Sequence, residues 1–133
     1  MMPKILSGVP LLPTRWGCAR IVLNKMPQEQ CAVIHGGLVH ESGKVYRQMI
    51  FGKVKVDSSK VRCPVHVISA SEDRIVSPAL CRKIAAYYHG SHRNYDGHAH
   101  WFLQEEGWEK IAAETLDWIE ASALKVTALE RAA

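Results

Sequence analysis

Apolar and polar residues follow two different patterns along this chain, with a change near residue 52. The first pattern consists of short apolar stretches at helical spacing that are separated by proline and glycine, and it predicts three short helices. We expect these helices at residues 14–24, with Thr14 as the N-cap, at 28–34 and at 44–51. Residues 1–13 contain several prolines and predict irregular structure.

The second pattern is typical of alternating strands and helices. The run at residues 65–70 is rich in β-branched residues and follows a proline, which predicts a strand that is buried on both faces. Ser77-Pro78 predicts the start of a helix, and residues 92–95 predict a second, short strand. A last helix is expected around Trp108, with a fraying tail from about Lys125. The chain is therefore expected to be an α/β protein in which a helical segment precedes a β-α-β-α segment.

Length and composition agree with a folded protein. The 133 residues are enough for one domain with a hydrophobic core, and 47% of them are hydrophobic while 23% are charged. The net charge is +4, but the basic residues are scattered. The densest group, Lys53, Lys55, Lys60 and Arg62, has no stacking aromatic residues beside it and indicates a solvated face. We therefore expect no nucleic-acid partner.

The cysteines and the apolar segments bear on the cellular compartment. Cys18, Cys31, Cys63 and Cys81 are widely spaced and form no C-x-x-C pair, so we expect buried, reduced thiols in a reducing, cytoplasmic environment. The apolar N-terminal stretch is interrupted by prolines and is not typical of a signal peptide. No run of about 18 apolar residues occurs, so no membrane-spanning segment and no membrane partner are expected.

Two residues suggest a reaction. Asp73 follows the first predicted strand. His100 follows the second predicted strand and lies 27 residues after Asp73. A carboxylate in this position can accept the Nδ1 proton of a histidine, which fixes the tautomer and leaves the other ring nitrogen free to act as a general base. The alternative is that Asp73 only caps its own loop and that His100 is a surface histidine.

Several motifs decide between these alternatives because their order and spacing resemble the C-terminal half of the α/β-hydrolase family. In that family the acid follows the penultimate core strand, and the histidine follows the last strand and precedes an aromatic residue. Asp73 and His100 match these two positions, although Ala70 stands where the family usually has glycine. The matching segments are Cys63–Ile68, Ser71–Pro78, Gly97–Trp101 and Glu106–Glu109.

The resemblance implies a partial α/β-hydrolase fold, with a helical cap-like segment at residues 1–52 and the C-terminal part of the core at 53–133. It implies a relative of serine esterases and lipases, with Asp73 and His100 as catalytic residues, no cofactor and no metal. The substrate would be a small apolar molecule or an ester. No G-x-S-x-G elbow for the nucleophile occurs, and the chain is expected to begin after that point of the fold. Of the serines present, Ser42 and Ser71 would be the first to test.

The missing nucleophile has two consequences. We expect the chain to be inactive alone as an enzyme, and we expect it to self-associate or to bind a complementary chain, because a two-stranded sheet leaves strand edges unpaired. Two other functions remain open. One is a non-enzymatic protein that binds a partner or a ligand, in which the acid and the histidine no longer act. The other is a zinc-binding protein that uses residues 96–100, where Asp96, His98 and His100 alternate.

Overall fold

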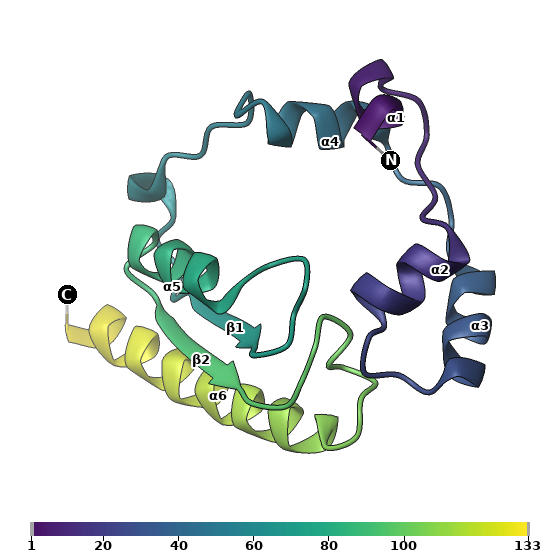
Figure 1. The fold of residues 1–133 in the computed structure, drawn as a ribbon. Helices are drawn as coiled ribbons and strands as arrows, with labels where there is room; N and C mark the ends of the chain where they lie inside the picture. Colours follow the sequence, from purple (N-terminus) through teal and green to yellow (C-terminus); the bar gives the residue numbers. More distant parts are fainter. Residues whose placement is uncertain (1, 133) are drawn as a thin grey trace. The chain divides into compact units, whose positions relative to one another are not determined.

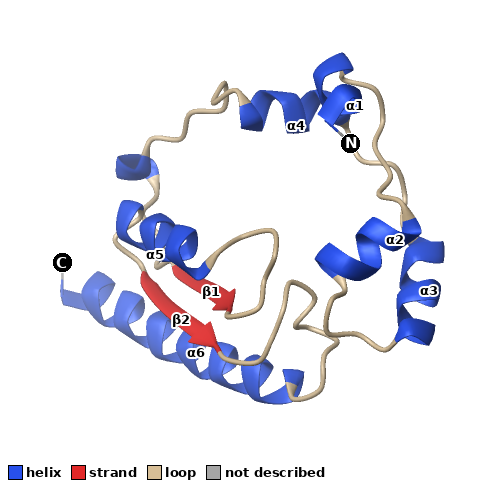
Figure 2. Ribbon diagram, in the orientation of Figure 1, coloured by secondary structure: helices blue, strands red, loops and turns tan. Residues whose placement is uncertain are grey.

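The computed structural model describes the backbone of residues 2–132 and the side chains of residues 5–124 (Figure 1). The chain forms two compact units, Met1–Arg62 and Cys63–Ala133. The first unit is helical, and both strands belong to the second unit (Figure 2). The protein is therefore a mixed α/β protein with a small parallel sheet. The predicted limits of the cap-like segment and of the core, at 52 and 53, stay a prediction.

The N-terminal residues of the first unit are more ordered than their prolines predict. Helix α1 spans Met2–Ser7, so the expectation of irregular structure throughout residues 1–13 is wrong. Pro3 occupies the first turn of this helix, where no backbone N–H is needed for a helical hydrogen bond. Gly8 then ends the helix with a left-handed backbone (φ 72°), and Ile5 places its side chain in the core of the unit.

The next two helices begin where the sequence predicts but do not end where it predicts. The Thr14 hydroxyl accepts a hydrogen bond from the Gly17 amide (3.1 Å), and the helix continues as α2 (Arg15–Gly17) and then as a π-helical turn, η1 (Cys18–Val22). It ends at Val22, two residues before the predicted end at Asn24. Helix α3 spans Gln28–Gly37, so its two glycines lie inside its last turn instead of after it.

Helix α4 confirms the third predicted helix. It spans Gly43–Ile50 and is capped by Ser42, whose hydroxyl accepts from the Val45 amide at 3.4 Å. A Cβ atom at position 43 would collide with the carbonyl of Val9, so glycine is required there. A short 3₁₀ turn, η2 (Ser58–Lys60), follows.

The second unit is built on a strand–helix–strand segment. Strands β1 (His66–Ala70) and β2 (Ser91–Tyr95) pair in parallel, with His66 opposite Ser91 and Ala70 opposite Tyr95. Helix α5 (Pro78–Tyr87) connects them, as Ser77-Pro78 predicts, and the Ser77 hydroxyl accepts from the Leu80 amide at 3.3 Å.

Three expectations for the second unit are corrected. Only Ser69 and Ala70 of β1 are buried, so the strand is not buried on both faces along its length, because β2 is its only partner strand in the described sheet. Helix α6 spans Trp108–Ala132, so its backbone stays helical beyond Lys125, which agrees with the helix-forming Ala, Leu, Lys and Glu residues there. Cys63 is exposed, whereas the other three cysteines are buried; all four are free thiols.

Candidate functional site

The candidate site lies where the two strands of the second unit end. In a parallel pair the carboxyl ends of both strands reach the same edge of the sheet, and Figure 1 shows the chain leaving β1 and β2 at the same end. The loop after β1 contains Asp73, and the loop after β2 contains His100. The topology therefore places the two predicted catalytic residues at one edge.

Asp73 and His100 contact each other directly. The Oδ2 atom of Asp73 is 3.0 Å from Nδ1 of His100, and the side chains are 8% and 33% exposed, respectively. The second carboxylate oxygen accepts hydrogen bonds from the backbone amides of Ile75 (2.7 Å) and Val76 (3.0 Å). Asp73 thus caps its own loop and also binds the histidine, so its two predicted roles are compatible. His100 keeps one ring nitrogen paired and enough exposure for a reacting group to approach it.

The environment favours the charged form of Asp73. Burial by itself raises the pKa of this carboxyl group, but the hydrogen bond with His100 and those from the amides of Val76 and Ile75 act in the opposite direction. Their combined effect, together with the electrostatic attraction of His100, lowers the pKa of Asp73 below its usual value. A carboxylate that stays ionised at neutral pH can both orient an imidazole and stabilise the imidazolium formed when that imidazole takes up a proton.

Hydrogen bonds also join the loop that contains Asp73 to the loop that contains His100. The Gly97 amide donates to the Ser71 hydroxyl (2.9 Å), and the Glu72 amide donates to the carbonyl of His98 (2.8 Å). Gly97 has a left-handed backbone (φ 77°), which turns the chain after β2 back towards the acid loop. The residues that precede Asp73 therefore bind the residues that lead to His100, through one backbone–backbone hydrogen bond and one bond to the Ser71 side chain.

Glu105 is a further residue of this region that the sequence analysis did not single out. Its side chain is only 4% exposed, and its Oε2 atom accepts a hydrogen bond from the Ala99 amide at 2.9 Å. Nδ1 of His98 lies 3.3 Å from the same oxygen, but its geometry does not meet that of a hydrogen bond. Within the described side chains, Glu105 Oε1 has no hydrogen-bond partner either. No local pattern in the sequence marks this glutamate as buried, since glutamate is normally exposed.

The alternating residues of segment 96–100 have separate partners. Asp96 accepts from the Asn94 side chain (3.0 Å), His98 lies beside Glu105, and His100 binds Asp73. Across the part of the chain that the structure describes, no group of three or more His, Cys, Asp or Glu side chains is placed to hold a metal ion. The arrangement thus gives no positive support to the zinc alternative.

The serines that the sequence analysis considered are engaged elsewhere. Ser42 caps α4 in the first unit, and the hydroxyl of Ser71 accepts from Gly97. The Ser69 hydroxyl lies 2.8 Å from Nε2 of His92 and is buried inside the sheet. None of the serine hydroxyls with a described side chain forms a hydrogen bond with His100 in the second unit.

Cys81 is the remaining nucleophilic side chain near the acid. Burial raises the pKa of its thiol, and the negative charge of Asp73 raises it further. Because the thiolate is the reactive form of cysteine, this environment keeps Cys81 in its unreactive form. The second unit therefore contains an oriented histidine for which no nucleophile has been found among the described residues.

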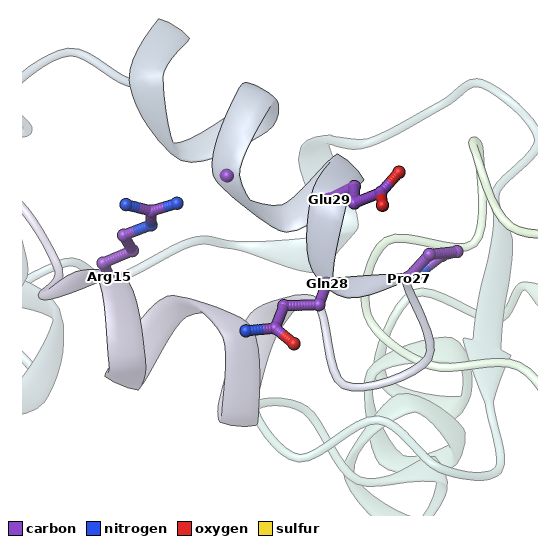
Figure 3. A pocket seen from close by; sticks show the side chains of 5 residues that line it. Arg15, Pro27, Gln28 and Glu29 are labelled. Atoms are coloured by element: carbon purple, nitrogen blue, oxygen red, sulfur yellow. The ribbon is translucent and has the colours of Figure 1, made fainter.

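The first unit has a separate surface depression between α2 and α3 (Figure 3). Its lining includes the oppositely charged Arg15 and Glu29 together with Pro27 and Gln28. Of its lining residues only Glu29 could act as an acid or a base, and none is a serine, cysteine or lysine that could act as a nucleophile.

None of the helices in the described residues is both long and apolar enough to cross a membrane. No protein-family model, no curated protein and no solved structure matches this chain.

Proposed function

We propose that the second unit provides the acid and the histidine of an α/β-hydrolase-type site that hydrolyses a small ester when a nucleophile is supplied from outside this chain. One observation above all supports the proposal, the 3.0 Å contact between Asp73 Oδ2 and His100 Nδ1. Two residues that are 27 positions apart are brought together at the strand ends, and the charged form of the acid is favoured.

The proposed chemistry follows from the two nitrogen atoms of His100. Its Nδ1–H donates to Asp73, so the lone pair of Nε2 is free to accept a proton from a hydroxyl nucleophile as that oxygen attacks the ester carbonyl. The imidazolium then returns the proton to the departing alkoxide, which leaves an acylated nucleophile. Water attacks the acyl group in the same way, losing its proton to Nε2, and the imidazolium then returns that proton to the nucleophile oxygen as its bond to the acyl carbon breaks and the acid product leaves.

The same geometry explains why we propose that the nucleophile is external. A general base acts only on a proton within hydrogen-bond reach, about 3 Å, and the hydroxyls of Ser71 and Ser69 have other partners. The chain also lacks the G-x-S-x-G turn whose backbone amides would stabilise the oxyanion. Losing one such donor lowers the rate by about 100- to 1000-fold. An isolated acid–histidine pair should therefore turn over esters very slowly.

The order of strands and helices along the chain supports this proposal. A parallel β-α-β segment precedes a long helix, and the loops after the two strands contain the acid and the histidine. This is the order that the resemblance to the C-terminal half of an α/β-hydrolase implies. Helices α1 to α4 precede it, which is compatible with the cap-like segment of the proposal.

The test is hydrolysis of p-nitrophenyl acetate by the full chain, alone and mixed with the N-terminal half of an α/β-hydrolase that contains its nucleophile elbow. Wild type alone should match Asp73→Asn, His100→Ala and an equal concentration of free imidazole. The mixture should give saturable turnover that is lost in both variants. His89→Ala is the matched histidine control, because His89 lies at the end of α5 and makes no described contact with Asp73.

Two results would contradict the proposal. Saturable turnover by wild type alone, lost in both variants, would reveal a nucleophile within the chain, and Ser42→Ala and Ser71→Ala would then identify it. Turnover of the mixture that persists in His100→Ala would mean that His100 is not the general base.

A second candidate function is binding without catalysis, and the exposed apolar side chains of α4 favour it. Val45, Met49 and Ile50 are 49%, 58% and 50% exposed, and Phe51 directly after the helix is 56% exposed. A cluster of this kind is typical of an interaction surface. Sedimentation at micromolar concentration tests the simplest case, self-association. A dimer that is lost in Met49→Lys but not in Val33→Lys, an exposed position of α3, would support it.

A further inference from the structure

We propose that Glu105 is a positioning residue that holds the loop before His100 so that its Nδ1 faces Asp73. This role rests on the proposed function, because it concerns the orientation of the proposed general base. The supporting contacts are local: Oε2 of Glu105 accepts the Ala99 amide at 2.9 Å, and Ala99 directly precedes His100 in the chain.

The burial of this contact indicates that it is specific. Ala99 is fully buried, and the Glu105 side chain is 4% exposed, so water cannot replace either partner of the hydrogen bond. A buried carboxylate is costly unless it is paired or hydrogen-bonded. Here it makes one hydrogen bond and lies 3.3 Å from the His98 ring, while Oε1 has no described partner. A serine or an apolar residue would fill the core more easily, so the carboxylate is best explained by what it binds.

The hydrogen bond from Ala99 completes a set of three that fix the approach to His100. Gly97 donates to Ser71, the carbonyl of His98 accepts from Glu72, and Ala99 donates to Glu105. The first two bonds tie the segment to the acid loop. The third is the last before His100 and reaches in the other direction, to the turn before α6. Without it, the backbone that determines the direction of the imidazole would be held on one side only.

The turn that contains Glu105 is itself well defined. The Gln104 amide donates to the carbonyl of Trp101 (3.0 Å), and the Trp108 amide donates to the carbonyl of Glu105 (3.1 Å). Gly107 has a left-handed backbone (φ 86°), which directs the chain into α6. The carboxylate is thus presented from a fixed turn, as a positioning residue requires.

The experiment measures the tautomer of His100 directly, by long-range proton–nitrogen NMR of the full chain labelled with ¹⁵N-histidine. In wild type the neutral imidazole of His100 should carry its proton on Nδ1, and Asp73→Asn should abolish this preference. Glu105→Ala should shift His100 to the mixture seen for a free imidazole, in which both tautomers are present. Glu105→Gln should keep the wild-type tautomer, because its amide oxygen can still accept the Ala99 amide.

His92 provides the control for folding. Its Nε2 lies 2.8 Å from the Ser69 hydroxyl within the sheet, and it should be unchanged in every Glu105 variant that folds. If Glu105→Ala loses the His92 signal as well, Glu105→Asp decides the matter, because it keeps the charge but withdraws the acceptor by one methylene. Loss of the His100 tautomer with His92 unchanged supports the role.

A His100 that keeps its Nδ1–H tautomer in a folded Glu105→Ala or Glu105→Asp protein overturns the role of Glu105. Loss of that tautomer in a folded Glu105→Gln protein would also overturn it, because the acceptor would then not be what matters. Failure of the proposed function would give different results. Either His100 of the wild type would show no tautomer preference that depends on Asp73, or the Asp73–His100 pair would form but the mixture with the N-terminal hydrolase half would not hydrolyse the ester.

Discussion

The two units of this chain differ in how they hold their loops. In the second unit, hydrogen bonds join the loops after β1 and β2 to each other and to the turn before α6, around a buried carboxylate. In the first unit two backbone hydrogen bonds join Leu11 and Glu41 (2.8 and 2.7 Å), and side chains reach single carbonyls, as when the His35 ring binds the Pro13 carbonyl (2.9 Å) and Arg47 binds that of Leu6 (3.1 Å). A precise polar arrangement therefore does not require a large sheet, because neighbouring loops can fix one another.

The cores of the units differ less than their polar contacts. Each unit buries a few apolar side chains and leaves many of its large ones exposed. Leu11, Cys18 and Leu23 are almost fully buried in the first unit, and Ala99 and Ile111 in the second. Both units should therefore depend strongly on single core positions, and only the second should respond strongly to the loss of single polar groups.

The largest expected effect comes from the core of the second unit. Ile111 is 1% exposed in α6, so Ile111→Ala should lower the free energy of unfolding by about 2–5 kcal/mol, through lost burial and a new cavity. Ile119→Ala is a matched control in the same helix, because Ile119 is 51% exposed. Urea unfolding of both variants, followed by hydrogen exchange of the β1 and β2 amides, measures the difference. Equal destabilisation would show that the helix packs differently from the description above.

The next effect tests the polar contacts of the site. Asp73→Asn keeps the shape of the side chain and can still accept from the amides of Ile75 and Val76, but it removes the charge that faces His100. Hydrogen bonds to charged groups contribute about 1.5–3 kcal/mol, so a loss of up to that size is expected at neutral pH. Ser42→Ala in the first unit should lose less, since Ser42 makes one neutral capping bond.

The pH dependence of this effect has a definite sign. The pKa of Asp73 is lowered in the folded protein, chiefly because the hydrogen bonds from His100 and the backbone outweigh burial. Its contribution to stability is therefore complete above the usual pKa of an unfolded aspartate and is lost as the pH falls through the lower, folded value. The urea midpoints of wild type and Asp73→Asn should converge in acid. A gap that widens as the pH falls would mean that Asp73 is not stabilised as a carboxylate.

The residues that could be predicted from the sequence are those whose role depends on neighbours in the chain. Ser77-Pro78 opens a helix, Thr14 caps one, and the β-branched run before Asp73 forms a strand, because each effect is local. The acid–histidine pair was also predicted, and the structure places the two residues in contact, because parallel strands bring their carboxyl ends to one edge. Their catalytic role stays a prediction.

The residues that were missed depend on contacts that no local pattern reveals. Glu105 lies in the turn before α6, and its burial and its hydrogen bond from the Ala99 amide depend on how that turn folds against the segment before His100. Helix α1 could not be predicted from the prolines of residues 1–13, because Pro3 lies in its first turn, where proline is well tolerated. Cys63 was expected in the core next to a buried strand, and the strand end beside it is partly exposed.

A moderate effect, about 1 kcal/mol, is expected from the helix caps. Ser77→Ala removes the acceptor for the Leu80 amide at the start of α5, and Ser77→Asp should restore it. The loop from Asp73 to Ser77 is short, so fraying of α5 should also reach the site. The measurement is hydrogen exchange of the first α5 amides together with the NMR signals of His100. A change confined to α5 would show that the site loop is fixed by Asp73 alone.

The smallest effect is expected where the two units are most alike, in their exposed ion pairs. Lys60 lies 3.9 Å from Asp57 in the first unit, and Lys110 lies 3.9 Å from Glu114 in the second, and both lysines are largely exposed. Solvent screens such pairs, so Lys60→Ala and Lys110→Ala should each change the free energy of unfolding by no more than about 0.5 kcal/mol.

Glu114→Gln is a sharper probe, because Glu114 also accepts from the hydroxyl of Tyr95 (2.9 Å) and lies 3.3 Å from Arg93. If Lys110→Ala proved as costly as Glu114→Gln, the polar contacts of the second unit would extend to its surface. The contrast with the first unit would then arise from the whole unit and not only from the loops around His100.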